Sequence, residues 1–222
     1  MIELDTLQFL RELKKNNRKE WFEKNRTRYE HAKKNFIEFA SELIYGVSKF
    51  DPAILKSQLD PKKSISRINR DIRFSKDKSP YKTNLFLIIS AKGKNAHSAA
   101  YYFHLEPDSS FLGGGVYMPE PNELFKIRNQ IHKKFGAWEK ILKNKELQAT
   151  YLEGILSPET LSRIPKGFLD TSPAREYLKK KGFYVKTEMS DKQLSDSKVT
   201  SKILEKYKVV RPLIDFLNEA IA

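Results

Sequence analysis

The stretch that decides the fold is residues 85–118, LFLIISAKGKNAHSAAYYFHLEPDSSFLGGGVYM. It opens with a continuous apolar run of strand length, Leu85 to Ile89, and residues 92–95 then give a turn signal. The Tyr- and Phe-rich segment 99–105 follows, and Pro107-Asp108 separates it from the apolar segment 111–118. Short connections of this kind join antiparallel strands, whereas parallel strands need a long crossover, so the stretch predicts an antiparallel meander.

Helical patterns lie on the N-terminal side of the meander. Leu7, Leu10 and Leu13 recur at a helical interval, and Asn16-Asn17 is a stop signal for that helix. A second apolar stripe runs from Trp21 to Ile44 and predicts one long helix packed on the core.

On the C-terminal side, the pattern after Pro121 becomes helical again. Residues 183–185 are a candidate edge strand, and residues 197–222 predict a final amphipathic helix that is interrupted near Pro212. The whole pattern predicts an α+β fold, with a central antiparallel sheet of about four to six strands flanked by N-terminal and C-terminal helices. Because nothing marks a boundary, residues 1–222 are expected to form a single domain.

Composition excludes several classes of protein. The chain of 222 residues has no cysteine, so disulfides, thiolate nucleophiles and cysteine-based metal sites are excluded. No apolar window is long enough to cross a bilayer, and the N-terminus lacks the pattern of a secretory signal, so we expect a cytoplasmic protein without a membrane partner. We expect no cofactor, and oligomeric state is not readable from the sequence.

Positive charge is concentrated just before the meander. The formal net charge is +14, and residues 62–82 contain eight basic side chains against two acidic ones, Asp71 and Asp77. Such a local density of positive charge attracts anions. Lysines dispersed over a solvated surface explain the charge elsewhere in the chain, but they explain this arginine cluster less well.

Residues 67–82, RINRDIRFSKDKSPYK, predict a strand followed by a loop. In an extended segment 67–74, Ile68, Ile72 and Phe74 would face the core, and Arg70 would share that face and need a partner from elsewhere or from a ligand. On the opposite face, Asp71 would brace Arg67 and Arg73 as a rigid pair of forks for a phosphate or carboxylate. Lys78 and Tyr81, on the loop, would close around the same anion.

Two readings of this segment stay open with equal weight. The functional reading is a ligand site formed by Arg67, Arg70, Asp71, Arg73, Lys78 and Tyr81. The structural reading is an arginine network that ties the sheet to carboxylates of the long helix.

The segment also resembles a known family. Arg67, Arg70-Asp71, Arg73-Phe74, Lys78 and Pro80-Tyr81 fit the pattern R-x-x-R-D-x-R-F-x-x-x-K-x-P-Y, which is similar to the signature of an uncharacterised bacterial family called domain of unknown function 2461. Three other stretches resemble the same family: residues 9–22, residues 101–115 with Pro119, and residues 165–168. The resemblance therefore extends over nearly the whole chain. It implies a single domain of this size and brings no established activity.

Two other features are candidates for chemistry. His104 and Glu106 share a face of their strand and form a possible acid–base pair, although a hydrogen-bonded sheet histidine is the favoured interpretation, and no metal site is expected. The triplet Gly113-Gly114-Gly115 can expose amides to a phosphate, but a β-bulge or a bend in the sheet is favoured as its cause.

The sequence is therefore compatible with three functions. The first is binding of an anionic ligand, including a nucleotide or nucleic acid, through Arg67, Arg70, Arg73, Lys76 and Lys78. The second is an enzyme acting on a phosphorylated or carboxylated small molecule at the same site, with Asp71 or His104 as catalytic candidates. The third is a structural arginine network in a protein-interaction module.

Overall fold

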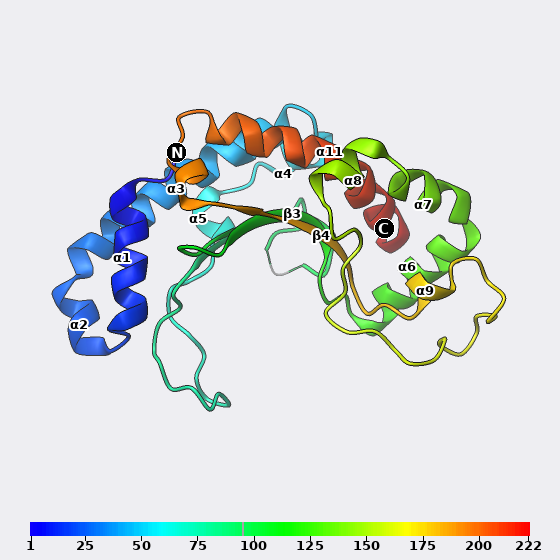
Figure 1. The fold of residues 1–222 in the computed structure, drawn as a ribbon, viewed down its shortest axis with the longest axis horizontal. Helices are drawn as coiled ribbons and strands as arrows, with labels where there is room; N and C mark the ends of the chain where they lie inside the picture. Colours follow the sequence, from blue (N-terminus) through cyan, green and yellow to red (C-terminus); the bar gives the residue numbers. More distant parts are fainter. Residues whose placement is uncertain (95) are drawn as a thin grey trace. The chain divides into compact units, whose positions relative to one another are not determined.

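The computed structural model describes residues 1–94 and 96–222. Four strands, β1 (Leu85–Ile89), β2 (Ala100–Leu105), β3 (Ser110–Val116) and β4 (Phe183–Met189), form one open antiparallel sheet in the order β1-β2-β3-β4 (Figure 1). Helices flank the sheet at both ends, so the α+β prediction is confirmed, and its strand number lies at the lower end of the expected range. The turn expected at residues 92–95 includes Asn95, which lies outside the described residues.

The helices before the sheet are α1 (Leu4–Lys15), α2 (Lys19–Lys24), α3 (Arg26–Ser48), α4 (Pro52–Ser57) and α5 (Pro61–Ser64). The helix α1 ends at Asn16, as its stop signal predicts. The prediction of one long helix from Trp21 to Ile44 is wrong in one respect, because the helix is interrupted at Asn25, between α2 and α3. The Asn25 side chain donates a hydrogen bond to the Trp21 carbonyl at 2.9 Å, which satisfies the end of α2 before α3 begins.

The helices after β3 are α6 (Pro121–Lys133), α7 (Phe135–Leu142), α8 (Lys145–Thr150), α9 (Arg175–Leu178), α10 (Asp191–Leu194) and α11 (Val199–Ile221). The interruption expected near Pro212 is wrong, since α11 is one helix with Pro212 inside it. Pro212 lies on the exposed side of α11, where water can satisfy the carbonyl that loses its intrahelical partner.

The contacts divide the described chain into two compact units. Unit 1 comprises residues 1–94, 102–112 and 188–204, and unit 2 comprises residues 96–101, 113–187 and 205–222. The strands β2, β3 and β4 and the helix α11 contribute residues to both. The expectation of a single domain stays a prediction.

The core of unit 1 lies between the N-terminal helices and one face of the sheet. Leu7, Leu10 and Leu13 of α1 are fully buried, as their helical spacing predicts. The Phe39 ring of α3 packs edge to face on the Phe103 ring of β2, with the ring centroids 5.1 Å apart. Burial of these apolar side chains is the main favourable term in folding.

The core of unit 2 is built around Trp138. The centroid of its ring lies 5.3 Å from that of Phe216 of α11 and 5.9 Å from that of Phe183 of β4. In the same unit, the Tyr101 ring of β2 packs on the Tyr207 ring of α11, with centroids 5.1 Å apart. All five rings are buried.

The glycine triplet lies inside β3. A Cβ atom on Gly113 would come within 1.9 Å of the Val185 carbonyl oxygen, and one on Gly115, which has φ +129°, within 2.2 Å of the Phe183 carbonyl oxygen. These two positions therefore need glycine because the backbone of β4 approaches them closely.

Candidate functional site

The Arg-rich segment forms a hairpin that continues beyond the start of β1. Residue pairs Ile65 with Leu87 and Asn69 with Tyr81 form isolated antiparallel bridges, and Lys82 N donates to the Ile68 carbonyl at 2.7 Å. We call residues 65–84 the basic arm, and Figure 1 shows it projecting past the end of the sheet. The strand expected at 67–74 is wrong, because after these few pairings no neighbouring element of the described chain continues the ladder.

The base of the arm is fixed to the N-terminal helices. The Tyr81 ring stacks on Phe22 with centroids 3.9 Å apart, and it is 6% exposed. The Asn17 side chain donates to the Tyr81 carbonyl at 2.8 Å and accepts from the Tyr81 N–H at 3.1 Å. Burial raises the pKa of Tyr81. Tyr81 thus holds the arm in place, away from the cations at the tip.

Two ion pairs brace the tip of the arm. Arg73 donates to both carboxylate oxygens of Asp71, at 3.0 and 2.7 Å, and Arg70 pairs with Asp77. Hydrogen bonds from Arg73 lower the pKa of Asp71, and hydrogen bonds from Ser79, followed by one from Arg70, lower the pKa of Asp77. Both carboxylates are therefore ionised at neutral pH, and each is engaged by an arginine of the same loop.

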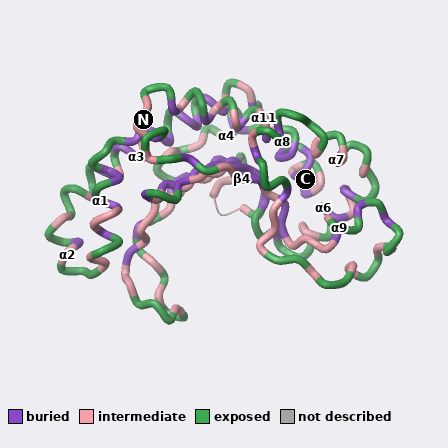
Figure 2. Tube along the Cα trace, in the orientation of Figure 1, coloured by how far each residue is buried: buried purple, intermediate pink, exposed green. Residues whose placement is uncertain are grey.

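The expectation that Arg70 faces the core is wrong. The Arg70 side chain is 26% exposed and lies within the arm, because Asp77 and Ser75 across the loop supply its hydrogen-bond partners. Phe74, expected in the core, is 96% exposed, and the Arg73 guanidinium lies 5.9 Å from its ring centroid. Figure 2 shows the contrast between the exposed tip and the buried strands.

Of the expected braced pair, the structure brings Arg73 and Asp71 into contact. Arg67 acts on Asp71 only at longer range, and it lowers the pKa of that carboxyl by charge alone. Lys78 donates to the Ile72 carbonyl at 3.0 Å.

Four cations of the arm have no carboxylate partner within the part of the chain that the structure describes: Arg67, Lys76, Lys78 and Lys82. Partial burial, then the charges of Arg67 and Lys94, lower the pKa of Lys82. Like charges that perturb one another in this way create a positive potential at the arm, which an anion would relieve.

His104 lies on the sheet face beside the base of the arm. Its Nε2 is 3.2 Å from Glu106 Oε2, and Glu106 is also 3.3 Å from Lys14 Nζ. Burial lowers the pKa of His104, and the hydrogen bond to Glu106 opposes that change. The His104–Glu106 contact is thus made, while its catalytic use stays a prediction.

Sequence reasoning missed the aromatic neighbours of His104. The His104 ring stacks on the Phe111 ring of β3, with centroids 4.6 Å apart. It also packs edge to face on the Phe86 ring of β1, with centroids 5.7 Å apart. The signal was available in the strand period, because Phe86 falls between Leu85 and Leu87 and must face away from them.

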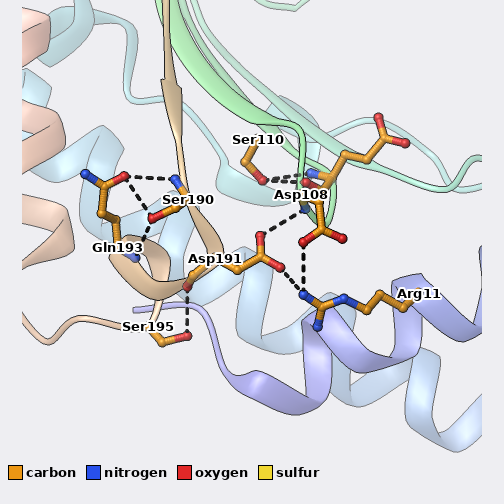
Figure 3. Close-up of polar contacts among 8 residues, drawn as sticks. Arg11, Asp108, Ser110, Ser190, Asp191, Gln193 and Ser195 are labelled. Carbon is orange, nitrogen blue, oxygen red and sulfur yellow. Dashed lines mark hydrogen bonds and ion pairs between the residues drawn. The ribbon is translucent and has the colours of Figure 1, made fainter.

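The turn between β2 and β3 is held by polar contacts, shown in Figure 3. The Ser110 hydroxyl donates to the Glu106 carbonyl at 2.8 Å and accepts from the Glu106 N–H at 3.0 Å. Asp191 accepts from the Asp108 N–H at 3.1 Å and pairs with Arg11 of α1. These contacts fix the positions of His104 and Phe111 relative to each other.

A metal site, an enclosed pocket at the arm and a membrane-spanning helix have less support among the described residues. Within residues 1–94 and 96–222, no three His, Cys, Asp or Glu side chains gather so as to hold a metal ion. The two pockets that are described lie in unit 2. One is lined by residues of α7 and α8 and by residues 151–155, the other by residues of the loop 162–170 with Arg175 and Lys179, and neither includes a residue of the arm. None of the described helices has the length and apolar character to span a membrane.

Comparison with known proteins gives one match. No match was found among curated proteins or among solved structures. A family model described as "Conserved hypothetical protein (DUF2461)" matches residues 5–216, which is nearly the whole chain. The chain therefore belongs to the DUF2461 family of conserved hypothetical proteins.

Proposed function

We propose that this protein binds nucleic acid, with the basic arm as the element that contacts the phosphate backbone. The observation that carries the proposal is how charge is arranged in the arm. Its two carboxylates are both used in ion pairs within the tip, and Arg67, Lys76, Lys78 and Lys82 keep their charge without a carboxylate partner in the described chain. The acids thus stiffen the arm without cancelling its positive field.

The shape of the arm suits a nucleic acid better than a small molecule. A two-stranded hairpin is narrow enough to enter the major groove of a duplex or to lie along a single strand. Its exposed cations lie along the hairpin, so they match a run of phosphates. Phe74, 96% exposed at the tip, is an apolar side chain that can contact or unstack bases.

The enzyme hypothesis receives less support at this place. Asp71 is exposed, paired with Arg73 and has a lowered pKa, so it suits an orienting role better than proton transfer. An arm that projects from the protein also lacks the enclosure that excludes water from a reaction.

The test is a binding titration of labelled oligonucleotides at several salt concentrations. The double variant Arg67→Gln/Lys76→Gln removes two cations that make no ion pair in the described chain. Its matched control, Lys126→Gln/Lys133→Gln, removes two exposed lysines of α6 and changes the net charge equally. We expect the arm variant to bind more weakly and to reduce the slope of log K against log salt by about 1 to 2, and the control to leave both unchanged.

Two outcomes would overturn the proposal. One is binding by the wild type that does not change with salt. The other is an equal loss in the arm variant and the α6 control, because binding would then follow net charge and not the arm.

A further inference from the structure

Three rings form a row across one face of the sheet in unit 1. Phe86 of β1, His104 of β2 and Phe111 of β3 lie on neighbouring strands, with centroids 5.7 Å and 4.6 Å apart along the row. The Tyr102 ring adds a neighbour, 6.0 Å from Phe86 and tilted by only 21°. We call Phe86, Tyr102, His104 and Phe111 the ring row.

The ring row lies on the face opposite to the hydrophobic core. The alternate residues of the same strands, Leu85, Leu87, Phe103 and Leu105, are buried, and Phe103 packs on Phe36 and Phe39 of α3. All four members of the ring row are partly exposed. Aromatic side chains on a partly exposed sheet face offer a ligand the ring faces and edges that their neighbours do not cover.

Cations lie along the edge of the sheet next to the ring row. Ser66, the first residue after Ile65 in the arm, accepts a hydrogen bond from the Phe86 N–H at 3.2 Å, so Arg67 follows directly beyond the Phe86 edge. Lys94 Nζ donates a hydrogen bond to the Ile65 carbonyl at 2.7 Å. After burial, the charges of Arg67 and Lys94 both lower the pKa of Lys82, so the three cations lie near one another. Ring surfaces and positive charge therefore adjoin at one place in unit 1.

The ring row is also held rigidly. Ser110 and Asp191 fix the turn that joins the strands of His104 and Phe111 (Figure 3). The Glu106 carboxylate holds the His104 ring, with 3.2 Å between Oε2 and Nε2. Burial favours the neutral form of His104, which stacks as an uncharged ring. A fixed platform costs little conformational entropy when a ligand binds.

We propose that the ring row stacks unpaired bases, so that the ligand of the arm is a single strand of nucleic acid. The inference rests on the proposed function and adds the substrate class. Bases of a duplex are paired and stacked on each other, and they cannot lie flat on a sheet face. A single strand can place its bases on Phe86 and Phe111 while its phosphates meet Arg67, Lys82 and Lys94.

The test compares an oligothymidylate of about ten nucleotides, which lies within the usual site size of such surfaces, with an abasic oligomer of the same length and with a duplex. The double variant Phe86→Leu/Phe111→Leu keeps apolar volume and removes two rings. We expect it to lower affinity for the oligothymidylate by about tenfold or more, since one stacked base contributes about 1–3 kcal/mol. Its affinity for the abasic oligomer and its salt slope should stay those of the wild type.

Two further variants control this experiment. Tyr45→Leu removes a ring that is 65% exposed on α3, and it should leave all affinities unchanged. Phe86→Trp keeps a stacking ring, and its fluorescence should be quenched by the oligothymidylate and not by the abasic oligomer, which gives a second readout if the leucine variant fails to fold.

The outcomes separate the two proposals. If Phe86→Leu/Phe111→Leu binds the oligothymidylate as the wild type does, or if the wild type prefers the duplex, or if Phe86→Trp is not quenched, the single-strand inference is wrong while the arm can still bind nucleic acid. If Arg67→Gln/Lys76→Gln binds every probe as the wild type does, the proposed function itself is wrong.

Discussion

The basic arm and the strand β1 that it leads into both place alternate residues on opposite faces, and they differ in what covers those faces. In β1, alternate residues Leu85, Leu87 and Ile89 are buried, because α3 and α5 pack on one face of that strand. In the arm, the same alternation places Ile68 in the core and Phe74 in solvent. Alternation therefore defines two faces, and a covering layer decides whether either becomes a core.

The two regions also differ in how they are held. The sheet depends on close backbone packing and buried rings, while the tip of the arm depends on ion pairs and hydrogen bonds within its own loop. Exposed ion pairs contribute little stability, so we expect changes in the sheet to affect folding and changes in the tip to affect binding.

The largest effect is expected in the sheet, at Gly113→Ala. The added Cβ would lie 1.9 Å from a backbone carbonyl of β4, which cannot move without breaking the strand pairing. We expect a loss of about 3 kcal/mol or more, measured by urea unfolding. The control is Gly136→Ala, in helix α7, where a Cβ meets nothing within 4 Å and alanine should be neutral or stabilising by up to about 1 kcal/mol. Equal effects of the two substitutions would contradict the close approach of β4.

The next effect is expected at the base of the arm, where the two regions join. Tyr81→Ala removes a buried ring stacked on Phe22 and should cost about 3 kcal/mol in thermal or urea unfolding. The exposed Tyr45→Ala is the matched control and should stay within about 0.5 kcal/mol of the wild type. A small effect at Tyr81 would mean that the arm is not fixed to α2.

A smaller, pH-dependent effect is expected at His104, on the sheet face. Burial lowers its pKa below the usual 6.5, so the unfolded chain takes up a proton at a pH where the folded chain does not. This difference destabilises the fold as the pH falls below about 6.5. Glu106 and Lys14 are the charged groups on the side of His104. Burial raises the pKa of Glu106, but hydrogen bonds from His104 and Lys14 outweigh it and lower that pKa on balance, so the carboxylate does not account for the fall. His104→Gln should therefore flatten the fall in unfolding free energy between about pH 7.5 and 5.5, and an unchanged fall would exclude His104 as its source.

The smallest effect on stability is expected at Phe74→Ala, in the tip. A side chain that is 96% exposed contributes almost no buried area, so the unfolding free energy should change by less than about 0.5 kcal/mol. The same variant should weaken oligonucleotide binding, because the ring is the apolar contact at the tip. A large loss of stability would show that Phe74 is covered in solution.

Several features of this protein were decided by the sequence alone. Apolar runs and turn signals placed the strands near 85–89, 99–105 and 111–118, since short turns leave only antiparallel pairing. The helical period of Leu7, Leu10 and Leu13 placed their buried stripe. The charge of the arm, and the signature that identifies the family, could also be read directly.

Only the tertiary structure decided where the polar and aromatic side chains point. The sequence could not show that Arg70 pairs with Asp77 and Arg73 with Asp71, since a loop of this length allows either arginine to pair with either carboxylate. Nor could it show that Phe86, His104 and Phe111 meet, because their contact depends on the register of three strands. Period and charge are local properties, whereas partners and exposure depend on which layer covers which face, and that is fixed only when the chain folds.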